Sequence, residues 1–134
     1  MAKALKDFVT EARGRIREID PDSAEEILED REEVLILDVR EPDEFAMGHI
    51  PGAVNVPRGI LESAADPDYK NPHPVLCRAQ ERPILLYCKS GGRSAMATAT
   101  LQEMGFEEVY NIAGGAAVWI GDDCSWEGEL KEDV

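Results

Sequence analysis

Four short apolar-rich runs, separated by segments of helical character, constrain what this chain can fold into. The runs are residues 34–37, 53–56, 84–87 and 109–112. Continuous apolar runs of this length are typical of strands that are covered on both faces. Strands that alternate with helices form parallel sheets, so the sequence predicts an α/β domain with a mainly parallel sheet.

The helical segments between these runs are marked by periodicity and by capping residues. Residues 3–16 carry an apolar stripe at helical spacing. Asp20 and Pro21 fit the N-cap and the first position of a second helix. Further helices are expected over residues 42–45, 60–65, 93–104 and 114–119. The N-terminal helix is expected to pack on the domain; a partner-binding helix is the alternative.

The length of 134 residues suits one domain. We expect an N-terminal helix over residues 1–15, a core domain over 16–121, and a short, exposed acidic tail over 122–134. Proline-rich residues 58–82 are expected to include a long loop, which is typical of functional or mobile segments. Neither a secretory pattern nor a membrane-spanning run is recognised, so the expected compartment is the cytoplasm.

Charge and cysteine content exclude several classes of protein. A net charge of −14 disfavours a nucleic-acid partner, since phosphate backbones require a basic surface. The three cysteines are an odd number and widely spaced, which argues against a disulfide scaffold. Cys77 and Cys124 are expected to be bystanders. Cys88 differs, because residues 82–102 contain cations but no Asp or Glu.

Cys88 is placed where an α/β domain usually carries its site, at the end of a predicted strand and before a predicted helix. The small residues 90–92 allow a loop whose backbone N–H groups form an anion-binding nest. The helix N-terminus and the cations Lys89 and Arg93 add to it. These features favour a thiolate, which is the nucleophilic form, open to an incoming reagent. The alternative is a buried, inert cysteine at a strand end.

Four residues separate Cys88 from Arg93. This loop is one residue shorter than that of cysteine phosphatases and resembles that of the rhodanese-like sulfurtransferases. Residues 38–45 (DVREPDEF) and 48–57 (GHIPGAVNVP) resemble the upstream motifs of that family. Residues 111–115 (NIAGG), with Trp119, resemble its C-terminal motif. The chain is therefore identified as resembling a single-domain rhodanese-like sulfurtransferase over about residues 16–121.

The resemblance implies a three-layer α/β/α fold with a five-stranded, mainly parallel sheet. It implies an enzyme of the thiosulfate sulfurtransferase type, in which Cys88 attacks a sulfane donor and carries a persulfide. The donor is a small anion such as thiosulfate, and the acceptor is a thiol, cyanide or a protein cysteine. No cofactor, metal, nucleic acid or membrane is expected. The implied substrate-binding residues are Lys89, Ser90, Gly91, Gly92, Arg93 and Ser94.

Three further residues are expected to support the site. Asp38 and Arg40 are expected to pair internally and brace the loop. His49 is expected to hold the turn in which it lies, with a general base as the alternative.

Lys89 is expected to attract an anionic donor, and Arg93 to pair with loop carbonyls or substrate.

Two other functions stay open at the level of the sequence. One is a sulfur-relay, regulatory or interaction domain of the same family, because fold does not fix function. The other is a cysteine phosphatase or arsenate reductase, which would use a similar anion-binding loop.

Overall fold

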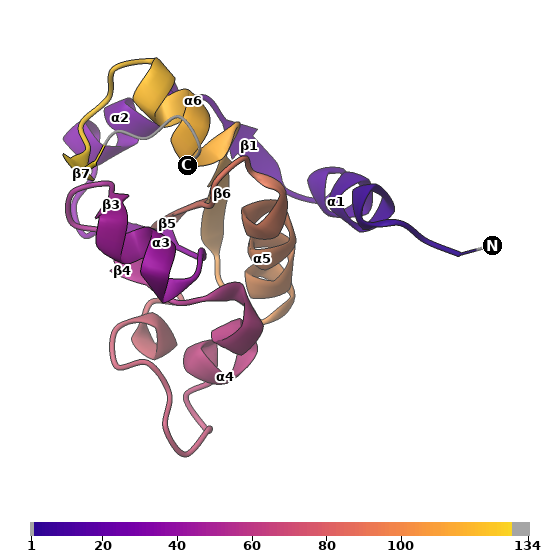
Figure 1. The fold of residues 1–134 in the computed structure, drawn as a ribbon. Coiled ribbons are helices and arrows are strands. Elements are labelled where there is room, and N and C mark those ends of the chain that lie inside the picture. The colour runs from indigo at the N-terminus through magenta and orange to yellow at the C-terminus, as the bar shows by residue number, and fades with distance from the viewer. Residues whose placement is uncertain (1, 130–134) are drawn as a thin grey trace.

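The computed structural model describes residues 2–129, and its centre is a sheet of five parallel strands in the order β1-β6-β5-β2-β4. The strands are β1 (Arg17–Ile19), β2 (Leu35–Asp38), β4 (Val54–Asn55), β5 (Pro83–Tyr87) and β6 (Glu108–Ile112). Helices cover both faces of the sheet and give three layers (Figure 1). The predicted three-layer α/β fold with a five-stranded parallel sheet is confirmed.

The central strands are apolar throughout because they face two cores. On β5, Ile84 and Leu86 point into one core, and Leu85 and Tyr87 point into the other. This alternation follows from the pleat, which turns successive side chains to opposite faces. The first core is covered by α4 (Leu61–Ala65) and α5 (Gly92–Glu103), and the second by α2 (Pro21–Asp30) and α6 (Gly115–Gly121).

The N-terminal helix α1 (Leu5–Arg13) lies outside these layers and packs against α5 (Figure 1). Its buried residue Ala12 contacts Ala95 and Ala99 of α5, and these small side chains let the two helices approach closely. The helix ends at Arg13, with Gly14 as its C-cap, whereas the sequence predicts a helix to residue 15.

Residues 17–19 form the edge strand β1, which pairs with β6. The residue pattern does not reveal this strand, because Ile19 is the one apolar residue in it and its two neighbours are charged and exposed. Hydrogen bonding to β6 overrides the weak local preference.

The segment after α6 is anchored as far as residue 129. Strand β7 (Glu127–Gly128) pairs antiparallel with β3 (Gly48–His49), which follows α3 (Pro42–Met47). Trp126 lies edge-on to Tyr87, with 6.4 Å between the ring centroids. Most of the described residues in this segment are exposed, as expected, but the segment is not loose, because β7 pairs with β3 and Trp126 docks on the domain. Residues 130–134 lie outside the described residues.

Residues 58–82 are tied to the domain at several points. They contain η1 (Arg58–Ile60), α4 and η2 (Leu76–Arg78). Leu76 is fully buried in the core beside α4. The predicted helix over residues 60–65 agrees with α4. None of the described helices has both the length and the apolar character needed to cross a bilayer.

Leu37 is fully buried in β2, between β4 and β5. We expect Leu37→Ala to lower the free energy of unfolding by about 2–5 kcal/mol, because a close-packed core does not refill the vacated volume. Ile60→Ala removes a similar side chain at an exposed position and should cost about 0.5 kcal/mol or less. Urea denaturation followed by tryptophan fluorescence measures both, and equal losses would contradict this placement of Leu37.

Candidate active site

Cys88 directly follows β5 and lies at the carboxyl edge of the sheet, where a short loop leads into α5. Gly91 is the N-cap of α5 and has a φ of 102°, a left-handed conformation that favours glycine. The turn at Gly91 brings the loop back over the cysteine side chain, so that its backbone amides approach the sulfur atom.

Hydrogen-bond donors from the loop and the first turn of α5 surround the sulfur of Cys88. The Gly91 N–H donates to Sγ at 3.1 Å. The Ser94 N–H and the Ser94 hydroxyl both donate to Sγ at 3.4 Å. We call this group of donors the sulfur cage. Donors directed at one sulfur atom stabilise negative charge on it, whether it is a thiolate or carries a further sulfur.

The N-terminus of α6 holds the opposite side of the loop. The Ala116 N–H donates to the carbonyl of Cys88 at 2.7 Å, and the Ala117 N–H donates to the carbonyl of Lys89 at 3.1 Å. Gly115 allows this approach, because a Cβ there would lie 2.4 Å from the carbonyl oxygen of Cys88. With these carbonyl groups turned to α6, the loop presents amide hydrogens to the sulfur.

A buried polar contact, which was not predicted from the sequence, holds Gly91 in place. Asn111 of β6 is fully buried, and its Nδ2 donates to the Gly91 carbonyl at 3.2 Å and to Glu18 Oε2 at 2.8 Å. Glu18 Oε2 also accepts from Arg13 Nε at 3.3 Å. The sequence feature that could have indicated this contact is the polar residue Asn111 within the apolar run 109–112. The contact links β1 and β6 to the sulfur cage.

Arg93 pairs with a carboxylate and not with the loop carbonyls that the resemblance implied, and the alternative of pairing with substrate stays a prediction. Its two Nη atoms donate to the carboxylate oxygens of Glu44 on α3, at 2.8 and 3.1 Å. The hydrogen bonds from Arg93 lower the pKa of Glu44, so the carboxyl is ionised at neutral pH. Glu44 thus offsets the positive charge that Arg93 brings to the edge of the site.

The other predicted binding residues differ in how far they are buried. Gly91 and Ser94 belong to the sulfur cage, and Gly92 opens α5 in a half-buried position. Lys89 and Ser90 are exposed on the outer rim of the loop. Their role in substrate binding stays a prediction.

Asp38 and Arg40 do form an internal pair, beside the end of β5. Both are buried, and Arg40 Nη2 donates to Asp38 Oδ2 at 2.8 Å and to the Gly48 carbonyl at 2.7 Å. Burial alone would lower the pKa of Arg40, but the hydrogen bond and charge of Asp38 outweigh burial and raise it. The pair therefore ties the end of β2 to β3, close to where Cys88 leaves the sheet.

Tyr87 and His49 complete this support. Burial and the nearby charge of Asp38 raise the pKa of Tyr87 well above its usual value, so its hydroxyl stays protonated and accepts from the Ile50 N–H at 3.1 Å. His49 stacks on Phe45 with 3.9 Å between centroids, and its Nδ1 lies 3.0 Å from the Phe45 carbonyl oxygen. These contacts are those of a residue that holds a turn.

The sulfur of Cys88 is enclosed, which the sequence did not predict. Only 1% of the residue is exposed. The expectation of an open thiol is wrong for this conformation, because the left-handed turn at Gly91 and the approach of α6 close the loop around the side chain. Opening the loop is therefore part of any reaction at Cys88.

The two remaining cysteines are free but differ in their surroundings. Cys77 is buried in η2, where its Sγ contacts the Pro74 carbonyl. Burial and the charge of Glu25 raise the pKa of Cys124 to about 11, so it is a protonated thiol at neutral pH. Neither is held in a cage like that of Cys88.

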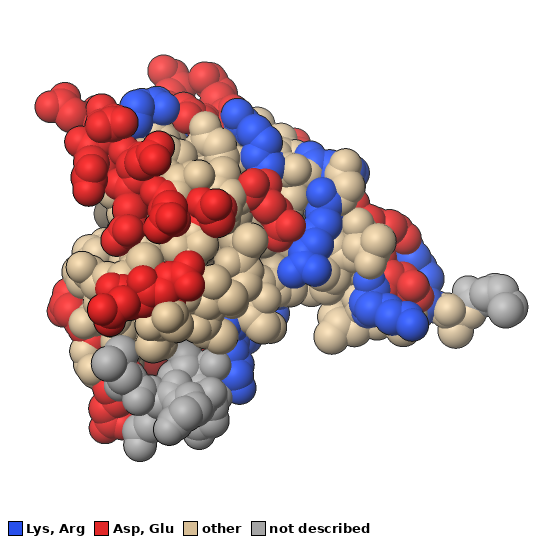
Figure 2. Space-filling model, turned by 90° about the horizontal axis from the view of Figure 1, so that it is seen from above, with Lys and Arg blue, Asp and Glu red and all other residues tan. Residues whose placement is uncertain are grey.

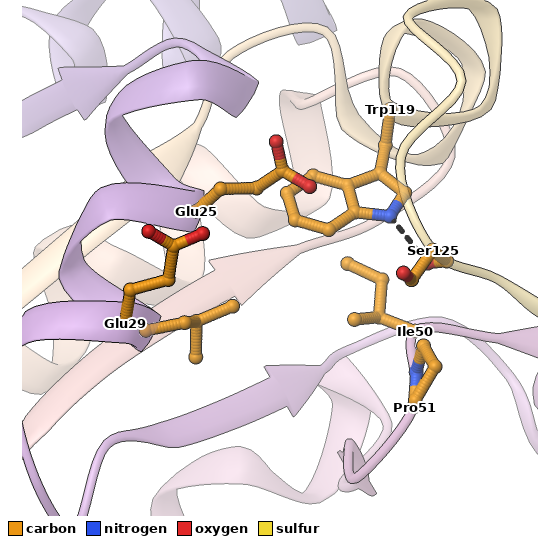
Figure 3. A pocket seen from close by; sticks show the side chains of 7 residues that line it. Glu25, Glu29, Ile50, Pro51, Trp119 and Ser125 are labelled. Atoms are coloured by element: carbon orange, nitrogen blue, oxygen red, sulfur yellow. Dashed lines mark hydrogen bonds between the residues drawn. The ribbon is translucent and has the colours of Figure 1, made fainter.

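A separate hollow lies between α2 and α6 and is closed by the segment that follows α6 (Figure 3). Trp119 forms its floor and donates through Nε1 to the Ser125 carbonyl at 2.8 Å. The carboxylates of Glu25 and Glu29 stand on its wall. Their negative charge disfavours an anionic substrate here, so we assign the chemistry to the loop at Cys88.

Comparison with known proteins shows the family to which the chain is related. A family model described as a rhodanese-like domain matches residues 20–122. A sulfurtransferase of Allochromatium vinosum is 36% identical over 78% of this chain and 88% of its own length. A putative sulfur carrier protein of Bacillus subtilis, YrkF, is 34% identical over 84% of this chain but only 55% of its own length.

One solved structure is similar over nearly the whole chain. It is a Rhodopseudomonas palustris protein described as of unknown function and a possible tyrosine phosphatase, with a TM-score of 0.86 and 30% sequence identity. The match covers 95% of this chain and 96% of that one, so it includes the region of α1.

Arg40 provides a test of the buried support. We expect Arg40→Met to lower the free energy of unfolding by about 3–5 kcal/mol, because Asp38 is left buried without its partner. Arg15→Met breaks an exposed pair with Glu103 and should cost about 1 kcal/mol or less. Thermal and urea denaturation measure both. A small loss for Arg40→Met would show that water reaches Asp38.

Proposed function

The chain belongs to the rhodanese-like domain family, and from this premise we propose that it is a sulfurtransferase that moves sulfane sulfur through a persulfide on Cys88. The observation that supports the proposal most directly is the sulfur cage. Its amide and hydroxyl donors are directed at Sγ, where both the attacking thiolate and the terminal sulfur of a persulfide concentrate negative charge.

The first half-reaction loads the sulfur, with thiosulfate as the proposed donor. The Cys88 thiolate attacks the outer sulfur of thiosulfate, and a new S–S bond forms at Sγ. The S–S bond of thiosulfate breaks, and its electron pair leaves with sulfite. The exposed Lys89 on the loop rim lies where it attracts the anionic donor.

The second half-reaction unloads the sulfur. An acceptor thiolate attacks the outer sulfur of the Cys88 persulfide, a new S–S bond forms on the acceptor, and the old bond returns its electron pair to Sγ. The cycle restores the Cys88 thiolate and needs no external oxidant or reductant. A partner cysteine reacts in the same way, whereas cyanide attacks the outer sulfur through carbon, forms a C–S bond and leaves as thiocyanate.

A sulfur relay is the second candidate, and similarity to a putative sulfur carrier favours it. In a relay the chemistry at Cys88 is the same, but the acceptor is the cysteine of another protein. Because Cys88 is enclosed, either acceptor reaches Sγ only after the loop opens. A partner protein has a larger contact surface than a small thiol, and can use it to open the loop.

Intact mass after incubation with thiosulfate tests the proposal. We expect the wild-type chain to gain the mass of one sulfur atom, and Cys88→Ser to gain none, because the thiolate is the group that attacks. Cys77→Ser and Cys124→Ser are matched controls and should load like the wild type, because neither thiol lies in the sulfur cage.

Two outcomes would contradict the proposal. No mass gain across a panel of sulfane donors would remove the transferase assignment. Turnover of an aryl phosphate that disappears in Cys88→Ser would instead support a phosphatase, which the structural relative from Rhodopseudomonas palustris is described as possibly being.

Glu44 gives a prediction about donor binding. We expect Glu44→Gln to speed loading by thiosulfate about two- to fivefold at low ionic strength, corresponding to the ~0.4–1 kcal/mol typical of half-exposed charge pairs. The reason is that Arg93 then keeps an unbalanced positive charge at the edge of the site.

Glu62→Gln is the matched control, since the exposed carboxylate of Glu62 on α4 pairs with Arg58 of η1. Its loading rate should equal that of the wild type. Stopped-flow mixing with mass readout measures the rates. An unchanged or slower rate in Glu44→Gln would mean that Arg93 does not contribute to attracting the donor.

A further inference from the structure

Helix α1 lies directly over the loop that carries the sulfur cage. A Cβ placed on Gly92 would lie 3.5 Å from Val9 Cγ2, and a Cβ placed on Gly91 would lie 3.3 Å from Arg13 Nη2. Packing of Ala12 against α5 holds the helix in this position. The N-terminal helix is therefore part of the surroundings of the candidate active site.

Between α1 and the loop the structure has a groove of about 430 Å³. This volume lies within the range of about 300–1,000 Å³ that is typical of small-molecule sites. It is larger than the hollow beside Trp119, which measures about 160 Å³. The groove is lined by Leu5, Lys6, Val9, Thr10, Arg13, Ser90 and Gly92.

The net charge of the residues that line this groove is opposite in sign to the net charge of the chain. Its charged lining residues are Lys6 and Arg13, and no Asp or Glu lines it, although the net charge of the chain is −14. Figure 2 shows basic and acidic side chains together toward the N-terminal end of the visible face, while acidic side chains predominate at the opposite end. Charge complementarity therefore favours an anionic occupant.

The groove also offers apolar contact. Leu5 and Val9 lie on its α1 wall, and Leu5 is 71% exposed. An inorganic anion such as thiosulfate has no carbon body to cover these side chains and is far smaller than the groove. The lining fits an organic anion of several carbon atoms.

We propose that this groove binds the sulfur acceptor, and that the acceptor is an organic thiol that carries carboxylate groups. This inference rests on the proposed function. The carboxylates pair with Lys6 and with the Nη side of Arg13, whose Nε is held by Glu18. The carbon body covers Leu5 and Val9, and the thiol reaches the loop at Ser90.

Once the loop has opened in the bound complex, the acceptor thiolate attacks the outer sulfur of the Cys88 persulfide. The S–S bond forms on the acceptor while the bond to Sγ breaks, and the electron pair returns to Sγ. The groove supplies proximity for this step, which turns an encounter in solution into a reaction between positioned groups.

The test compares two acceptors on protein that has been loaded with sulfur. Mercaptosuccinate carries two carboxylates, and 2-mercaptoethanol carries none; the loss of persulfide is followed by quenched-flow mass measurement. We expect Lys6→Glu to lower the ratio of the two rate constants, mercaptosuccinate to mercaptoethanol, about tenfold at low salt, because an attraction becomes a repulsion. Added salt should reduce this effect.

Lys70→Glu is the matched control, because it makes the same charge change at an exposed residue outside the groove. It should keep the wild-type ratio. The proposal is overturned if the ratio stays constant in Lys6→Glu, if Lys70→Glu lowers it equally, or if the loss is confined to loading by thiosulfate, which would make the groove a donor site.

A binding measurement separates this inference from the proposed function. S-methyl mercaptosuccinate cannot accept sulfur, so its binding to the unloaded protein requires no chemistry at Cys88. We expect it to shift the amide NMR signals of Lys6, Thr10 and Ser90 in the wild type and not in Lys6→Glu. Absence of these shifts overturns the groove as an acceptor site even where Cys88 loads normally. Their presence in a protein that takes up no sulfur supports the groove and removes the transferase.

Discussion

The pairing of β2 with β5 places the ends of two buried strands side by side, with Asp38 opposite Tyr87. Because both strands are covered on both faces, they have little freedom to shift, and Cys88 leaves the sheet at a defined position. The buried contact between Asp38 and Arg40 then fixes α3 and β3 on one side of that position. The N-termini of α5 and α6 converge on it from the other side.

Full charges near the sulfur are largely balanced, so backbone and hydroxyl dipoles provide its immediate surroundings. Arg93 is paired with Glu44, and Arg40 with Asp38. The donors that contact Sγ come from Gly91 and Ser94, and they are fixed before any substrate arrives. In the closed conformation, dipoles of this kind stabilise negative charge on Sγ, and opening of the loop changes the position of the Gly91 donor.

Most of the fold was predictable, because buried parallel strands leave apolar runs and because Asp20 and Pro21 mark a helix start. Strand β1 was not predictable, because Ile19 is the only one of its residues that is not exposed, and the strand forms through its pairing with β6. The position of Cys88 and the inward amides followed from the glycine-containing loop before a helix. The partner of Arg93, the anchor at Asn111 and the enclosure of Cys88 depend on contacts between residues distant in sequence. The local sequence pattern therefore does not predict these contacts.

The approach of Gly115 to the carbonyl of Cys88 has a consequence for the order of assembly. The loop owes its shape to amide groups of residues 116 and 117, which come after one further helix, α5, and one further strand, β6. A chain emerging from the ribosome therefore exposes its thiol before the segment that shapes the loop has emerged. Until α6 docks, Cys88 is an ordinary thiol on a growing chain, and its special environment is among the last features to mature.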